Sequence, residues 1–157
     1  MDLPWALDYD PENCSIGAAV GIIGEKWTFL VLREVFVGVR RFADMQRRTQ
    51  APRQILSDRL SRLVRDGLMR RVPYQEEGQR SRNEYRLTEK GRDLYPIIVA
   101  LMEWGDRYAA PSGPPVTLTH RDCGQPVRLQ LTCEKGHSLA SAREVTPVPG
   151  PSARKIA

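Results

Sequence analysis

The chain reads PRQILSDRLSRLVRDG from Pro52 to Gly67, and this stretch has the pattern of an amphipathic helix between two turn residues. Pro52 suits the first turn of a helix, where its missing N–H is not needed, and Gly67 suits the end. Between them, five apolar residues recur at helical spacing: Ile55, Leu56, Leu60, Leu63 and Val64. The pattern predicts a helix with one face in a core and the other face in solvent.

The segments on either side of this helix complete a familiar arrangement. A short helix is expected over residues 41–49, and extended segments are expected over residues 68–74 and 84–87. The polar loop between these two segments, residues 75–83, is too long for a tight hairpin and carries two arginines. A helix, a turn, a second helix and a two-stranded wing make a winged helix-turn-helix. We therefore predict a mainly α fold of this DNA-binding type.

Positive charge is concentrated in the same region. Residues 40–92 hold fifteen Lys or Arg residues and seven Asp or Glu residues, a net charge of +8, whereas the whole chain carries +5. All but one of these cations are arginine. The planar guanidinium group fits phosphate oxygens and the edge of guanine better than an ammonium group does. This excess predicts double-stranded DNA as a partner.

Further helices are expected around this module. Asn13 is a suitable N-cap for a helix from Cys14 to about Gly24, and a second helix, residues 26–37, is apolar almost all round. Thr88 can cap a long helix to about residue 108. That helix carries one apolar stripe: Leu94, Ile97, Ile98, Leu101, Trp104, Gly105 and Tyr108. A domain of this size has little core left for the stripe to cover, so the stripe predicts a homodimer.

A linker rich in proline and glycine divides the chain near residue 110. We predict a DNA-binding and dimerisation domain over residues 1–110, a small β-rich tail over residues 111–145 and a flexible C-terminus over residues 146–157. The tail is expected to hold strands at 116–119 and 126–132 and turns at Cys123-Gly124 and Lys135-Gly136.

The composition favours a cytoplasmic protein. The 157 residues, 41% of them hydrophobic, are enough for one ordinary core. The N-terminal residues are acidic and lack the basic flank and apolar run of a signal peptide. No apolar run approaches the roughly 20 residues that a membrane span needs. Three cysteines are too few for a disulfide framework in a protein of this compartment.

Several blocks between Cys14 and Trp104 occur in a recognisable order. They are Ile23-Gly24-Glu25-Lys26-Trp27-Thr28, Leu32-Arg33-Glu34, Arg41-Phe42, Ile55-Leu56-Ser57-Asp58-Arg59-Leu60, Asp66-Gly67-Leu68 and Glu84-Tyr85-Arg86-Leu87-Thr88. This series resembles the HxlR-type transcriptional regulators, winged-helix proteins related to the MarR group. The resemblance implies a homodimer that binds a near-palindromic operator, and some members sense oxidants through a cysteine placed like Cys14. The tail beyond Pro111 lies outside the resemblance.

The polar face of the helix over residues 52–67 is the predicted recognition surface. It lies opposite the leucines and comprises Arg53, Gln54, Ser57, Asp58, Ser61 and Arg62, with Arg65 in the last turn of the same face. Arg53 falls in the first turn, where a recognition helix usually meets base edges. Asp58 can accept from a cytosine amino group, but an ion pair with Arg62, four residues on, is the role we expect. Arg59 can contact phosphate or pair within the fold. The alternative for the whole face is an ordinary solvated surface.

Arg80 and Arg82 are the candidate DNA contacts of the wing. They lie near the tip of the loop, from which side chains can enter a minor groove or lie along phosphates. The alternative is that they are exposed loop arginines without a partner, and the nearby acids Glu76 and Glu77 favour it.

Cys14 is the candidate redox sensor. It is expected in the first turn of a helix, where the helix dipole and the unpaired N–H groups favour a thiolate, the form that oxidants attack. The alternative is an inert cysteine, buried against Ile16 or against the long helix of the partner subunit. The chain has no second cysteine between Ser15 and Asp122 that could form a bridge near the helix-turn-helix.

A candidate metal site lies in the tail. Its residues are His120, Cys123, Cys133 and His137. Two cysteines and two histidines suit the tetrahedral geometry of structural zinc. The alternative is four neighbouring side chains without a metal, because the spacing of the second pair departs from the usual Cys-x-x-Cys turn. No other cofactor is required.

The sequence shows no enzyme signature: it has no Gly-rich phosphate loop and no nucleophile with a suitable base. We expect a homodimeric, sequence-specific transcriptional regulator that responds to thiol oxidation or to a small effector. Repression is favoured, because binding over a promoter needs no further contacts. Two other interpretations stay open. One is a non-specific nucleic-acid-binding or architectural protein, and the other is a protein-interaction module that works through its tail.

Overall fold

The structure is a computed structural model that describes residues 10–154. These residues belong to two compact units. The larger unit comprises residues 23–129, and the smaller unit joins the segment before residue 23 to the segment from residue 130 onward. The division predicted near residue 110 falls inside the larger unit, and it stays a prediction.

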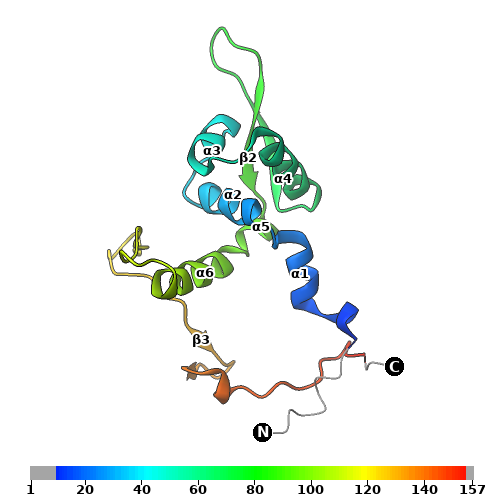
Figure 1. Ribbon diagram of the computed structural model, residues 1–157, viewed down its shortest axis with the longest axis vertical. Helices are drawn as coiled ribbons and strands as arrows, with labels where there is room; N and C mark the ends of the chain where they lie inside the picture. The colour runs from blue at the N-terminus through cyan, green and yellow to red at the C-terminus, as the bar shows by residue number, and fades with distance from the viewer. Residues whose placement is uncertain (1–9, 155–157) are drawn as a thin grey trace. The chain divides into compact units, whose positions relative to one another are not determined.

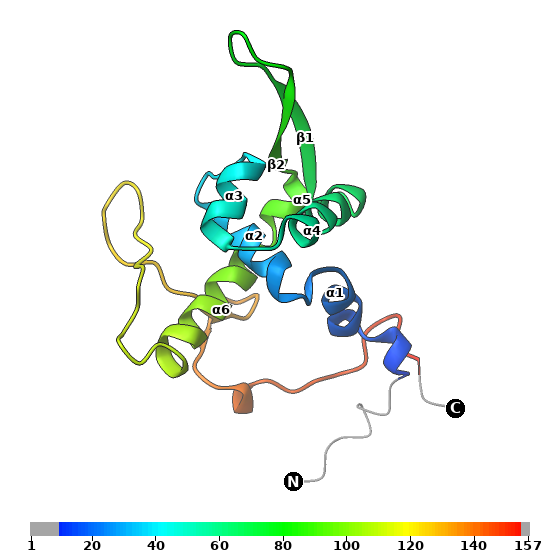
Figure 2. The same cartoon turned by 45° about the horizontal axis from the view of Figure 1, so that its top comes forward.

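The larger unit has the predicted winged helix-turn-helix (Figure 1, Figure 2). Its elements are α2 Lys26–Phe36, α3 Phe42–Thr49, α4 Arg53–Arg65, β1 Met69–Tyr74, β2 Arg82–Leu87, α5 Glu89–Arg92 and α6 Tyr95–Tyr108. Helices α2, α3 and α4 begin and end within two residues of the predicted bounds. The predicted mainly α fold with a two-stranded wing is confirmed.

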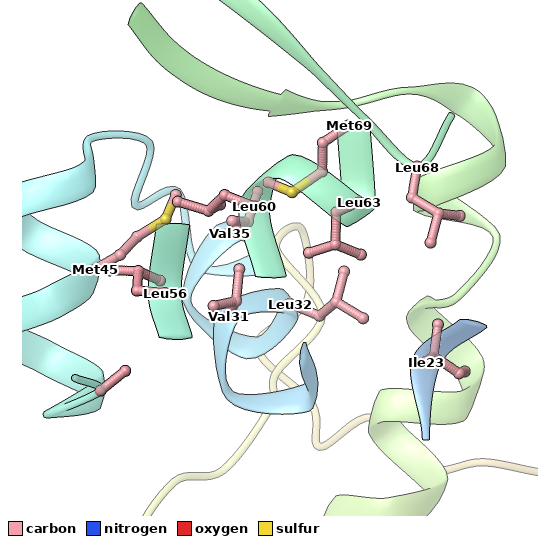
Figure 3. Close-up of a cluster of buried hydrophobic side chains, with 11 residues drawn as sticks. Ile23, Val31, Leu32, Val35, Met45, Leu56, Leu60, Leu63, Leu68 and Met69 are labelled. Atoms are coloured by element: carbon pink, nitrogen blue, oxygen red, sulfur yellow. The ribbon is translucent and has the colours of Figure 1, made fainter. Parts of the chain in front are cut away.

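One apolar cluster joins α2, α3 and α4 (Figure 3). Leu56 and Leu60 of α4 are fully buried, as are Val31 and Leu32 of α2 and Met45 of α3. The side chains point toward one another from the three helices (Figure 3). Burying one leucine of this kind contributes about 1.5–3 kcal/mol. The spacing of the leucines in α4 therefore decides which of its faces turns to solvent.

Hydrogen bonds within the turn between α3 and α4 give partners to its buried polar groups. Gln50 ends α3 in the left-handed region, with φ of 57°. The Thr49 hydroxyl donates to the Met45 carbonyl at 2.7 Å and accepts from the Ala51 N–H at 3.2 Å. Buried backbone groups without partners would cost stability. These bonds therefore hold the tight turn that leads from α3 into α4.

The wing consists of β1, β2 and the loop between them. The two strands are antiparallel, and their pairing reaches Tyr74 opposite Arg82, so β2 begins two residues before its predicted start. Glu84 of β2 also bridges to Arg41, directly before α3. The wing extends beyond α3 and α4 in both views (Figure 1, Figure 2).

The single long helix predicted after Thr88 is in fact two helices. Thr88 caps α5 as predicted, and its hydroxyl accepts from the Gly91 N–H at 3.1 Å. However, α5 ends at Arg92, and α6 begins only after two further residues. Pro96 accounts for the break, because it has no N–H to donate to the Arg92 carbonyl and its ring would clash with that carbonyl in a continuous helix.

The apolar stripe predicted on this helix divides between two faces of α6. Four of its members are large and exposed: Ile97, Leu101, Trp104 and Tyr108. Leu94, just before α6, and Ile98 instead pack against the core, which corrects the prediction for these two residues. At about 100° per residue, Ile98 turns away from the row that the exposed four share.

The smaller unit contains short elements. They are η2 Pro11–Asn13, α1 Ser15–Ile23, β3 Leu131–Thr132, β4 Ser138–Leu139 and η3 Ala142–Glu144, although Ile23 itself belongs to the larger unit. Most of α1 is exposed, including its apolar residues Ile16, Val20 and Ile22.

No single helix of residues 10–154 has the length and apolar content to cross a membrane. Among these described residues, only α1 and α2 taken together are long and apolar enough, and a break with a bend of 78° separates them.

The start of α1 differs from the prediction. Asn13 is not its N-cap: the Asn13 side-chain oxygen accepts from the backbone N–H of Arg154 at 3.1 Å. Cys14 directly precedes the helix, and its sulfur accepts from the Gly17 N–H at 3.4 Å. A thiol therefore takes the position that the asparagine amide was predicted to hold.

The tail has less strand than predicted. The observed pairings are Thr119 with Pro126, Leu131 with Leu139 and Thr132 with Ser138. Both predicted turns are present, since Gly124 and Gly136 have φ of 69° and 81°. Val127 and Leu131 remain exposed. Longer strands would need a second layer to cover such residues, because an isolated two-stranded pair is only marginally stable.

Candidate nucleic-acid interface

The predicted recognition residues of α4 all lie on its exposed face. They are Arg53, Gln54, Ser57, Asp58, Ser61 and Arg62. On the opposite face Leu56, Leu60 and Leu63 are at most 2% exposed. Residues three or four apart share one face of a helix. Burial of the leucines therefore brings these six polar side chains together on one surface.

Gln54 and Asp58 are paired with each other on this surface. Gln54 Nε2 donates to Asp58 Oδ1 at 3.0 Å. The predicted ion pair between Asp58 and Arg62 is not formed by the described residues, so that prediction is wrong. Held in this way, Gln54 keeps its carbonyl oxygen and one N–H for a base edge, the two groups that adenine requires.

Glu25, directly before α2, forms ion pairs with two arginines of α4. Its Oε1 lies 2.5 Å from Arg59 Nη1 and 3.7 Å from Arg62 Nη1. The Arg59 side chain is only 15% exposed, so Arg59 pairs within the fold. The longer, exposed contact of Arg62 contributes little energy. Arg62 can therefore leave Glu25 for DNA at low cost, whereas Arg59 is a structural residue.

The two wing arginines have different surroundings. Both are exposed, and Arg82, the first residue of β2, lines a hollow of about 700 Å³ together with Arg41, Arg53 and Glu76. Arg80, closer to the tip, is not among its lining residues. The structure thus brings Arg82 close to the start of α4 and leaves Arg80 further along the loop.

Arg41 is a residue of this surface that the sequence did not single out. Arg41 Nη1 lies 2.5 Å from Glu76 Oε1, and its guanidinium group lies 4.4 Å from the centre of the Tyr74 ring. Arg53 is placed similarly, 5.2 Å from the Phe42 ring. Glu76 is 35 residues away from Arg41 in sequence. The sequence signals for this position were the local excess of arginine and the Arg41-Phe42 block of the family resemblance.

A charge cluster around the buried Glu34 side chain links α3 to α2. Arg33 Nε and Nη2 donate to one carboxylate oxygen of Glu34, at 2.8 and 2.5 Å, and Arg48 Nε donates to the other. Burial raises the pKa of Glu34, but the hydrogen bonds and charges of Arg48 and Arg33 outweigh it, so the pKa lies below its ordinary value. The carboxylate therefore stays ionised and links the two helices at neutral pH.

Cys14, the candidate redox sensor, is exposed. The alternative of a buried cysteine is therefore wrong for the single chain. The sulfur accepts the Gly17 N–H at the start of α1. Cys123 and Cys133 are also free and exposed.

The candidate metal ligands fall in different units. His120 and Cys123 belong to the larger unit, with Nδ1 3.2 Å from Sγ. Cys133 and His137 belong to the smaller unit, where the Cys133 N–H donates to the His137 carbonyl at 3.0 Å. In the part of the chain that the structure describes, neither unit by itself groups three His, Cys, Asp or Glu side chains for a metal ion. The zinc site stays a prediction.

The sequence matches an established family. The model of the HxlR-like helix-turn-helix family matches residues 22–113. This chain belongs to the HxlR-like family. Among its relatives, the HTH-type transcriptional regulator Rv3095 of Mycobacterium tuberculosis is 50% identical over 146 residues, which cover 92% of this chain and 91% of Rv3095. The likeness to that relative therefore extends beyond the family model, into the tail.

Solved structures place this HxlR-like protein among winged-helix regulators. PA1607, a candidate transcription factor, is 38% identical with a TM-score of 0.76, over 87% of this chain and 94% of PA1607. The redox regulator HypR in its oxidized form is 30% identical with a TM-score of 0.55, over 60% of this chain and 96% of HypR. The predicted HxlR resemblance is confirmed, and its fold is that of helix-turn-helix transcriptional regulators.

Proposed function

We propose that this HxlR-like protein regulates transcription by binding a near-palindromic operator as a homodimer, and that it represses. The exposed polar face of α4, beside the wing in a region with a net charge of +8, carries the proposal. A helix with such a face can enter the major groove with its first turn toward the bases. The names of its relatives as transcriptional regulators support the same function. Repression requires only that the bound protein cover a promoter.

The exposed row of α6 supports the homodimer. Ile97, Leu101, Trp104 and Tyr108 are 42–63% exposed. A row of large apolar side chains on a soluble protein marks an interaction surface. A second copy of the same helix presents the same row, so a symmetric dimer would cover both rows at once. Two recognition helices related by a two-fold axis would then read two half-sites.

A gel-shift titration on the DNA upstream of the coding gene tests sequence-specific binding. A specific regulator is expected to bind its operator about 10³-fold more tightly than competitor DNA. Equal affinity for both would favour the alternative of a non-specific or architectural protein. A truncation after residue 110 that binds DNA normally but no longer regulates would favour the protein-interaction alternative.

Arg53→Ala and Gln54→Ala test the recognition helix. Each is expected to relax base preference at defined operator positions, by about 1–3 kcal/mol of discrimination, because groove contacts specify and phosphate contacts only position. Arg65→Ala is the matched control, since Arg65 lies in the last turn and pairs with Asp66. Uniform weakening over all sequences would contradict the assignment.

The double change Arg80→Ala and Arg82→Ala tests the wing. Affinity is expected to fall for all sequences, and the dependence of log affinity on log salt to flatten by about one unit per lost phosphate contact. Arg121→Ala, an exposed arginine of the tail, serves as control. An unchanged salt dependence would place the wing away from DNA.

Thiol oxidation is the signal that we propose for this regulator. Cys14 is exposed and accepts a backbone N–H, and HypR, named as a redox regulator, has a similar fold. Hydrogen peroxide would transfer one oxygen atom to Cys14 Sγ, giving a sulfenic acid and water. Treatment with hydrogen peroxide is expected to change operator affinity in the wild type and not in Cys14→Ser. The double variant Cys123→Ser and Cys133→Ser should respond as the wild type does. A response in Cys14→Ser would exclude Cys14 as the sensor.

A further inference from the structure

A cavity of about 650 Å³ lies between α2, α6 and residues 115–118, all within the larger unit. Most of its wall is apolar and includes Phe36, Val37, Ile98, Val99, Met102 and Leu118. Phe36 and Tyr95 pack with their ring centres 5.0 Å apart at its edge. Cavities of this size and composition typically hold small organic ligands.

One wall of this cavity is positively charged. The Glu34 side chain is 3% exposed, whereas those of Arg33 and Arg48 are 51% and 49% exposed. In this wall the Glu34 carboxylate is therefore buried, whereas the guanidinium groups of Arg33 and Arg48 are exposed. Arg33 uses Nε and Nη2 on Glu34, and Arg48 uses only Nε, so each keeps N–H groups for another acceptor. Guanidinium donors beside apolar walls suit a carboxylate that is attached to an apolar body.

The other acid among the lining residues belongs to the opposite wall. Asp106 lies on α6, one helical turn beyond Met102. A ligand carboxylate is therefore expected against α2 and α3, and the apolar part of the ligand against α6 and residues 115–118.

Helix α6 connects this cavity to the proposed dimer surface. Val99 and Met102 face the cavity, whereas Leu101 and Trp104 belong to the exposed row. At 100° per residue, the two sets lie on opposite sides of the helix. A ligand that fills the cavity would press on the helix that the partner subunit packs against.

We propose that this cavity binds a small apolar molecule with a single carboxylate, one per subunit, and that its occupancy shifts α6 and so changes the dimer. The binding step stands on the cavity alone, while the second step rests on the proposed homodimer. Binding is measured on the full chain without DNA, so its outcome is separate from that of the proposed regulatory function.

Three naphthalene derivatives with the same ring system test the ligand chemistry by calorimetry: 1-naphthoate, 1-naphthalenemethanol and 1-naphthylmethylamine. The acid is expected to bind once per subunit, roughly tenfold more tightly than the alcohol, because it adds charge-assisted hydrogen bonds to the arginines. The amine is expected to bind most weakly. No binding of the acid would overturn the proposal, as would an equal or higher affinity for the alcohol or the amine.

Variants locate the site. Arg33→Gln is expected to reduce the affinity of the acid to that of the alcohol and to leave the alcohol unchanged, and Arg47→Gln, an arginine of α3 outside this cavity, is expected to change neither. Met102→Trp should fill the cavity and abolish both. Val116→Trp fills it from an exposed position, which keeps the test valid if Met102→Trp does not fold. Full binding by a folded Val116→Trp variant would overturn the site.

The coupling to the dimer is tested by sedimentation. Saturating 1-naphthoate is expected to change the dimer dissociation constant by roughly 5-fold or more, the usual range for coupled sites. An unchanged constant in the wild type would overturn the second step and leave the binding step standing.

Discussion

Helices α4 and α6 have similar lengths but very different burial. Of the 13 residues of α4, Leu56, Leu60 and Leu63 are buried, whereas of the 14 residues of α6 only Val99 is buried. The apolar face of α4 is completed within one chain, and its polar face is left for a partner such as DNA. The apolar row of α6 stays 42–63% exposed among the described residues of the chain. The comparison indicates that a single chain buries the apolar face of α4 but leaves the apolar row of α6 exposed.

Leu60→Ala gives the largest effect expected from this comparison. Leu60 is fully buried, so the change should lower the free energy of unfolding by about 2–5 kcal/mol at every protein concentration. Leu101→Ala is the matched change on α6 and should act only where the dimer forms. Urea unfolding at two protein concentrations separates the two effects. Equal losses at both sites in dilute protein would show that α6 is already packed in the monomer.

Leu101→Glu tests whether the exposed apolar row of α6 forms the dimer interface. A carboxylate in the middle of the row would be buried without a partner in the dimer, at a cost of several kcal/mol. Light scattering should then report a monomer. Lys90→Glu, on the exposed surface of α5, should remain dimeric. A dimer of normal stability in Leu101→Glu would move the interface to another element, such as α1 or α2.

Glu34→Gln probes the charge cluster that links α2 to α3. The folded-state pKa of Glu34 lies below its ordinary value of 4.5, so its ionised form stabilises the fold above that pH, and the contribution is lost as the pH falls through the folded-state pKa. The variant should lose about 1–3 kcal/mol at neutral pH, since Arg33 and Arg48 lose a charged partner. Unfolding measured from pH 3 to pH 7 should show the difference between wild type and variant shrink in acid.

The matched control for this pH series is Glu77→Gln in the exposed wing loop, for which no loss is expected. A difference between Glu34→Gln and wild type that stays constant down to pH 3 would contradict the role of the ionised carboxylate.

Removal of a metal ion is expected to have the smallest effect on the stability of α4. If His120, Cys123, Cys133 and His137 bind zinc, the protein should hold about one zinc per subunit, and chelation should loosen the tail without unfolding the helix-turn-helix. Metal analysis and hydrogen exchange on untagged protein measure both. Cys133→Ser should lose the metal and Cys14→Ser should keep it. An ordered tail without zinc would show that the four residues are only neighbours.

The sequence by itself determined the elements whose signals are local. Residues three and four apart meet on one face of a helix, so the leucine spacing predicted both α4 and its exposed face. The Thr88 cap and the turn glycines Gly124 and Gly136 depend on their own backbone and were also predicted. The break before α6 has a local cause as well, Pro96, but the apolar pattern runs across it and hid the break.

The tertiary structure alone decided which charged side chains meet. Arg59 pairs with Glu25 and Arg41 with Glu76, and in both cases the partners are distant in sequence. A helical period cannot predict such pairs, because they depend on how α4 packs on α2 and where the wing lies. The cavity beside Glu34 has the same origin. Its walls come from separate segments, and only their packing creates the space between them.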